Sequence, residues 1–99
     1  MEIKITTEGK ETIAALIGRL DTMAAQEIAP KMDELKNVSG TLILDCSELS
    51  YISSSGLRIF LTLRKAAAEK GGKVIVRSMS NEIRSVFMMT GFMNLFEIQ

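Results

Sequence analysis

The chain contains no histidine, no tryptophan and only one cysteine among its 99 residues. Histidine is the commonest general base and the commonest metal ligand, so Ser-His-Asp and Cys-His catalysis are excluded. The single cysteine, Cys46, permits neither an internal disulfide nor a thiolate metal cluster. We therefore expect no enzymatic activity, no metal and no cofactor, and we interpret Cys46 as a small buried hydrophobic residue.

An excess of charge of either sign is also missing. Twelve basic and twelve acidic residues cancel, and this balance with few aromatic residues argues against nucleic acid as a partner. No apolar run approaches the ~20 residues that cross a bilayer, and the first residues lack the hydrophobic segment of a signal peptide. The sequence therefore predicts a cytoplasmic protein without membrane insertion.

Phosphate-binding glycine loops are absent as well, which leaves nucleotide binding without support. Two carboxylates, Asp21 and Asp45, lie near the ends of expected strands, and a pair for glycoside chemistry could be drawn from them on position alone. A domain of this size cannot build a deep saccharide cleft around them. We interpret both as surface carboxylates.

The residues that are present suit one small globular domain spanning residues 1–99, with 46% hydrophobic residues for a single core. Segments of strand and helix character alternate in the order β-β-α-β-α-β-α-β. This order predicts an α/β fold: a mixed sheet of four to five strands, opening with an antiparallel hairpin, with the helices packed on one face. The expected strands cover residues 1–6, 12–18, 41–45, 73–77 and 95–98, and the expected helices residues 22–36, 54–70 and 81–90.

Two segments conflict with simple patterns. Pro30 falls inside the first expected helix, where it removes a hydrogen bond, so we expect a kink near Ile28 or two short helices. Residues 46–53 are predicted to form a loop. Tyr51 and Ile52 in that loop are expected to turn inward, away from the polar turn that follows.

The sequence leaves the role of two groups of apolar residues open. Leu57 and Leu61 lie to one side of the second expected helix, where they either form a docking patch or pack against a neighbouring helix. Met88, Met89 and Met93 near the C-terminus suit either an adaptable contact surface or the core. For the methionines we favour the core.

The most informative segment is a run of three serines and a glycine, residues 53–56, which we call the serine turn. It stands where a helix begins and where the first backbone N–H groups have no helical partner. One serine can cap the helix, and two are left unassigned. Gly56 is a poor helix residue, which suggests close approach to the backbone. A phosphate would be tolerated here, although local chemistry alone ranks a plain cap above a phosphorylation site.

The sequence resembles the STAS domain family, whose best-known members are bacterial anti-sigma factor antagonists. The likeness extends over nearly the whole chain. It is carried by Gly-Arg-Leu-Asp at 18–21, Leu-Ile-Leu-Asp at 42–45, Tyr-Ile-Ser-Ser-Ser-Gly-Leu at 51–57, and the Thr-Gly-Phe and Leu-Phe-Glu-Ile pair within 90–98. Each motif is short, but their order and spacing match together.

The resemblance implies a phosphorylation switch. In the family the serine directly before the glycine is phosphorylated, which points to Ser55 here, with Ser54 as the second choice. The implied partner is an anti-sigma factor with serine kinase activity, which binds the unphosphorylated form, and a serine phosphatase restores binding. The implied contact surface comprises Asp21, Ser53, Ser54, Ser55, Gly56, Leu57, Arg58 and Leu61.

Departures from the family pattern bear on that switch. Ser53 replaces the usual aspartate, which removes a negative charge and can alter kinase recognition or shift modification to Ser54. Arg58 replaces a small residue of many relatives and can pair with a phosphate or an acidic partner. We expect Asp21 near the serine turn, where it would repel a phosphate unless Arg19 or Arg58 offsets it.

A second interpretation of the same family needs no phosphorylation. The chain would then be a constitutive structural or regulatory subunit, for example of a lipid-transport or signalling assembly. The serine turn would serve only as a helix cap. The two interpretations differ in whether partner binding depends on the phosphorylation state.

Overall fold

The computed structural model describes all 99 residues and contains five strands and three α-helices. The elements are β1 (Glu2–Glu8), β2 (Glu11–Leu20), α1 (Thr22–Leu35), β3 (Thr41–Ile52), α2 (Ser54–Glu69), β4 (Lys73–Arg77), α3 (Asn81–Thr90), the short 3-10 helix η1 (Phe92–Asn94) and β5 (Glu97–Ile98). The predicted element order and the mixed α/β fold are confirmed.

The sheet follows the chain, with strand order β1-β2-β3-β4-β5. β1 and β2 form the expected antiparallel hairpin, and every later pairing is parallel. Parallel neighbours need a crossover, and α1, α2 and α3 supply the three crossovers. All parallel strands therefore end at the same end of the sheet.

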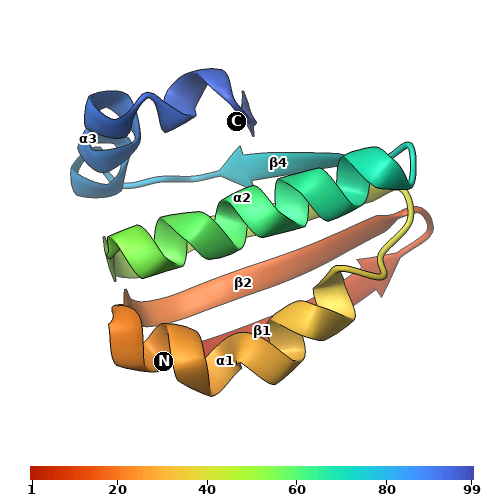
Figure 1. Ribbon diagram of the computed structural model, residues 1–99, viewed down its shortest axis with the longest axis horizontal. Helices are drawn as coiled ribbons and strands as arrows, with labels where there is room; N and C mark the ends of the chain where they lie inside the picture. The colour runs from red at the N-terminus through yellow and green to blue at the C-terminus, as the bar shows by residue number, and fades with distance from the viewer.

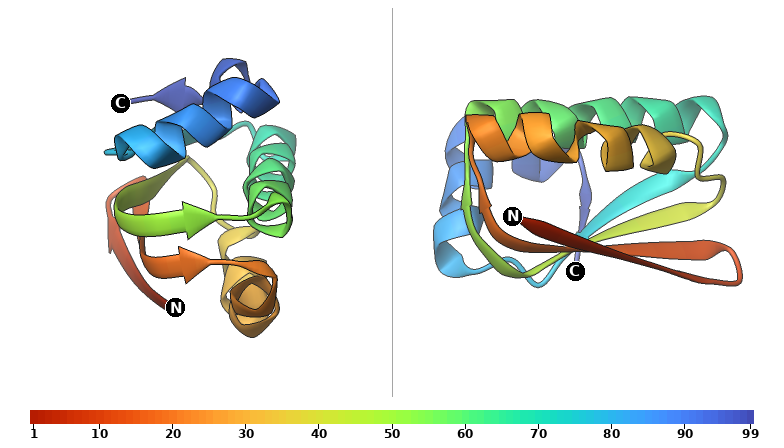
Figure 2. Two further views of the ribbon diagram at one scale, coloured as in Figure 1. Left: turned by 90° about the vertical axis from the view of Figure 1, so that its left-hand side faces the viewer. Right: turned by 90° about the horizontal axis from the view of Figure 1, so that it is seen from below.

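α1 and α2 lie on one face of the sheet, and α3 closes the core at one end of the strands (Figure 2). In the right panel α1 and α2 run side by side above the strands, α3 stands at the end where both helices begin, and no helix lies beneath. All three helices contribute to one core with the strands. Phe60 of α2 and Phe87 of α3 meet there edge to face, with ring centroids 5.8 Å apart.

Residues 46–52, predicted as loop, belong to β3. Two register shifts in the pairing with β2 each place one extra residue in β3. Buried side chains consequently recur at every third position, at Cys46, Leu49 and Ile52, and the alternation that marks a strand in sequence is lost. The predicted inward orientation of the side chain is correct for Ile52 and wrong for Tyr51. Tyr51 is 40% exposed, with the Arg19 guanidinium 4.4 Å from its ring centroid.

Helix α1 continues through Pro30, so the alternative of two short helices is wrong. Ile28 and Met32 on either side are buried, whereas Pro30 itself is exposed. The proline ring leaves the carbonyl of Gln26 without its helical partner. Gln26 is also exposed, so water can supply the missing hydrogen bond.

The methionines near the C-terminus are mostly on the surface. Met88 is 64% and Met89 is 86% exposed, so their predicted place in the core is wrong. The inward stripe of α3 is occupied by Ile83 and Phe87, four residues apart, and the two residues that follow Phe87 on the helix face away from the core. Met93, in η1, packs partly buried against the core as expected.

Candidate functional site

Two helices begin next to each other at one end of the sheet (Figure 1). The last residues of β2 and β3, Leu20 and Ile52, are paired in register. The next residue on each strand, Asp21 and Ser53, is the N-cap of α1 and α2 respectively. This pairing brings Asp21 to the serine turn, as the sequence predicted.

Ser53 supplies the cap of α2. Its Oγ accepts a hydrogen bond from the Gly56 N–H at 3.2 Å, and its own backbone N–H donates to the Leu20 carbonyl at 2.9 Å. Asp21 caps α1 in the same way, accepting from the Ala24 N–H at 2.9 Å. Aspartate and serine are both strong N-caps. Ser53 therefore preserves the local geometry that an aspartate would give, without its charge.

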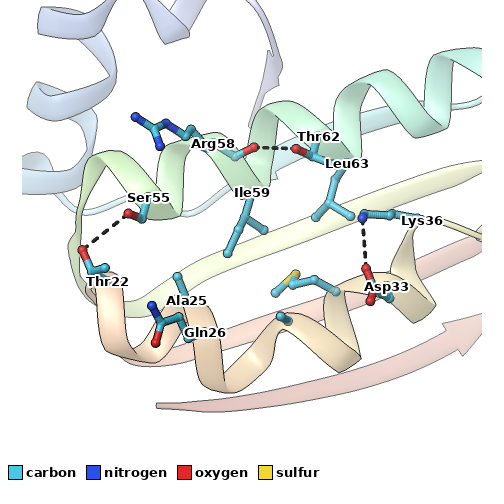
Figure 3. Close-up of a pocket in the computed structure, with 12 residues that line it drawn as sticks. Thr22, Ala25, Gln26, Asp33, Lys36, Ser55, Arg58, Ile59, Thr62 and Leu63 are labelled. Carbon is cyan, nitrogen blue, oxygen red and sulfur yellow. Dashed lines mark hydrogen bonds and ion pairs between the residues drawn. The ribbon is translucent and has the colours of Figure 1, made fainter.

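Ser54 and Ser55 are free of the capping role. Ser54 is exposed, and Ser55 is half-buried beside the start of α1. The Ser55 Oγ lies 3.4 Å from the Thr22 Oγ1, a long hydrogen bond between the first turns of the two helices (Figure 3). Sequence reasoning missed Thr22 because nothing in the chain pattern shows which α1 residue faces Ser55.

Gly56 is required by the protein's own core. A Cβ at this position would lie 2.8 Å from Leu20 Cγ and 2.8 Å from Ile52 Cγ1, closer than real contacts allow. The close approach predicted from the glycine is therefore real, and it is made by β2 and β3. Leu57 is also buried in the core, at 5% exposure, and Leu61 is half-buried. For Leu57 the structure favours packing over a docking patch.

The charges around the serine turn are few. Arg58 is exposed and forms no ion pair, and its side chain extends back toward the start of α2 (Figure 3). Arg19 stacks on Tyr51 instead. Arg58 is therefore the unpaired cation that stands one helical turn after Ser55.

A groove of about 330 Å³ separates α1 from α2 and begins at Ser55. Its walls carry Thr22 and Gln26 of α1 and Arg58 and Thr62 of α2. Sequence reasoning missed this groove, since it depends on how the two helices are spaced.

The remaining candidate groups are not at this site. Asp45 pairs with Ala15 well before the end of β2, so it is not brought to Asp21, and it forms an ion pair with Arg77 at 3.9 Å. Cys46 is fully buried, as expected. Burial, and secondarily the Asp45 carboxylate, raises the pKa of its thiol from 9.0 to about 12. None of the helices has both the length and the apolar character needed to span a membrane.

Known proteins share this architecture. SpoIIAA from Bacillus, an anti-sigma factor antagonist, has been solved unphosphorylated and phosphorylated. The unphosphorylated form superposes with a TM-score of 0.75 at 21% identity, covering 99% of this chain and 87% of SpoIIAA. The phosphorylated form gives 0.74 at 22% identity, with coverages of 99% and 91%. These likenesses establish the fold.

Sequence comparison reaches the same family. The chain is 28% identical to BtrV of Bordetella bronchiseptica, over 87% of this chain and 75% of BtrV. It is 24% identical to the anti-sigma-B factor antagonist of Bacillus subtilis, over 84% of this chain and 76% of that protein. The family model of the STAS domain matches residues 2–99. With its sheet order, its capped helix pair and this match over nearly every residue, the chain belongs to the STAS domain family.

Proposed function

We propose that this protein is an anti-sigma factor antagonist controlled by phosphorylation of Ser55. Unphosphorylated, it binds an anti-sigma factor that has serine kinase activity. Phosphorylation of Ser55 releases the partner, and a serine phosphatase restores binding. The protein acts by binding and contributes no catalysis of its own.

The observation that carries the proposal is that different serines of the serine turn have different roles. Ser53 is committed to the cap, and Ser55 occupies the position directly before the buried Gly56, where the family carries its phosphoacceptor. Relatives named anti-sigma factor antagonists, and a solved phosphorylated form of SpoIIAA, support this role. Ser54 is the second choice, because it is exposed on the same turn.

The location of Ser55 suits a reversible modification. A phosphate brings nearly two negative charges and three acceptor oxygens. At the first turn of α2 the unpaired N–H groups and the helix dipole stabilise an anion, so the fold tolerates it. At a contact surface the same charge disfavours binding unless the partner matches it. Phosphorylation thus changes binding and leaves the fold intact.

The site assignment is tested by intact-mass measurement and peptide mapping. The purified protein is incubated with ATP, Mg²⁺ and the cognate anti-sigma factor. We expect one added phosphate, located on Ser55 and absent from Ser55→Ala. Ser54→Ala is the matched control and should still accept it. A phosphate that persists in Ser55→Ala, or no phosphate on the wild type, would refute the assignment.

A further inference from the structure

The groove between α1 and α2 is built from one stripe of each helix. On α2 it is lined at helical spacing by Ser55, Arg58, Ile59 and Thr62 (Figure 3). α1 contributes a matching stripe from Thr22 to Asp33, followed by its C-cap Lys36. One end of the groove is thus the serine turn itself. A group held at that end of the groove lies next to Ser55.

The floor of the groove is apolar. Ala25 and Ala29 stand where larger side chains would close the gap between the helices, and Met32, Ile59 and Leu63 complete the surface. Ala29 is exposed and Ile59 is half-buried, so both present apolar surface that a bound side chain can contact. Ala25, Met32 and Leu63 are already buried.

The rim of the groove carries a net positive charge. Lys36 and Asp33 neutralise each other at the far end, where Nζ and Oδ1 are 2.9 Å apart. Arg58 at the serine end has no such partner. The one uncompensated charge along the groove is therefore a cation beside Ser55, and it suits a carboxylate on the partner.

We propose that this groove is the docking surface for the anti-sigma factor and that it accepts an apolar side chain flanked by a carboxylate. The apolar side chain lies on Ala29 and Ile59, and the carboxylate binds the Arg58 guanidinium. This inference rests on the proposed function and adds the chemistry of the partner's contact segment.

The same arrangement explains how a phosphate would release the partner. Residues three apart on a helix are neighbours, so a phosphate on Ser55 reaches Arg58. Two negative charges added to a rim of one net positive charge leave that rim negative. Arg58 then pairs with the phosphate, and the partner's carboxylate loses its cation and meets like charge.

The test is the affinity of unphosphorylated variants for the purified anti-sigma factor, measured by isothermal titration calorimetry. Ala29→Phe fills the groove and Arg58→Glu reverses its charge. Both residues are exposed, so both variants should keep the wild-type melting temperature. We expect each to weaken binding about tenfold or more.

Two matched controls lie outside the groove. Ala68→Phe changes an exposed alanine of α2, and Lys65→Glu reverses an exposed, unpaired cation of the same helix. Both should bind within about twofold of the wild type. In addition, replacing the contacting carboxylate of the anti-sigma factor by arginine should restore binding of Arg58→Glu.

Three results would overturn the inference. Groove variants that bind as tightly as the wild type would show that the partner docks elsewhere, while the proposed function stands. A wild-type dimer in sedimentation experiments that dissociates in Ala29→Phe would show that a second copy occupies the groove. A wild type that does not bind the anti-sigma factor at all would refute the proposed function itself.

Discussion

At the scale of single residues, Gly56 and Ser53 determine how Ser55 is presented. Gly56 allows the first turn of α2 to rest directly on Leu20 and Ile52, and Ser53 closes that turn by binding the Gly56 N–H. Ser55 lies between these two fixed points. The position of Ser55 therefore depends on the absence of a side chain at Gly56 and on the hydroxyl of Ser53.

Replacing Gly56 by alanine should destabilise the protein. Overpacking a close contact costs about 1–3 kcal/mol, and the better helix propensity of alanine returns only about 1 kcal/mol. We expect the free energy of unfolding, measured by urea titration, to fall by up to about 2 kcal/mol, with a central value of about 1 kcal/mol. Ser54→Ala, on the exposed side of the same turn, should change it by less than about 0.5 kcal/mol. Equal stability of Gly56→Ala and the wild type would show that the turn is not tightly packed.

Cys46 gives the protein a predictable response to alkaline pH. Burial, with a smaller contribution from Asp45, raises the pKa of its thiol from 9.0 to about 12. Well below pH 9 the thiol is protonated in both the folded and the unfolded state and does not change the stability with pH. Between pH 9 and 12 the unfolded chain loses a proton that the folded protein keeps, so stability falls as pH rises, by at most about 1.4 kcal/mol per pH unit.

The measurement compares the wild type with Cys46→Ala, which removes the thiol and leaves the other titrating groups. Urea unfolding at a series of pH values gives the difference in free energy of unfolding between the two proteins. We expect a constant difference from pH 6.5 to 8.5 and a decreasing one from pH 9 to 10.5. A difference that stays constant to pH 10.5 would contradict the raised pKa.

At the scale of elements, the residue at which a helix begins can be predicted from its neighbours in sequence, whereas the length of a strand cannot. Asp21 and Ser80 cap α1 and α3 by binding an N–H three residues further on, and a cap of this kind can be identified in sequence because it depends on residues within one turn. The second half of β3 was missed because its bulges arise from pairing with β2, which is distant in sequence. Pro30 was misjudged for a related reason: its exposure on the folded helix decides whether the lost hydrogen bond matters.

The cap of α2 can be tested by two substitutions at one position. Ser53→Ala removes the acceptor of the Gly56 N–H and should lower the free energy of unfolding by about 1 kcal/mol. Ser53→Asp keeps an acceptor and adds a favourable charge at the helix start, so it should equal or exceed the wild type. Thermal or urea unfolding distinguishes them. A Ser53→Asp protein as unstable as Ser53→Ala would contradict the capping role.

At the scale of the whole molecule, the sheet order creates the candidate site. Parallel β2 and β3 end in register, so α1 and α2 begin together and Asp21 lies beside the serine turn. The proximity of Asp21 to the serine turn could be predicted from the element order and the family resemblance. The contact of Thr22 with Ser55 and the groove could not be predicted, because both depend on the distance and rotation of two packed helices, which no residue pattern specifies.

The switch itself is tested most directly by one pair of affinities. The cognate anti-sigma factor is titrated with the unphosphorylated protein and with the protein phosphorylated on Ser55, under identical conditions. We predict tight binding of the first form and at least about hundredfold weaker binding of the second, a difference of about 2.7 kcal/mol. Equal affinities of the two forms would contradict the account and favour a constitutive subunit in which the serine turn is only a helix cap.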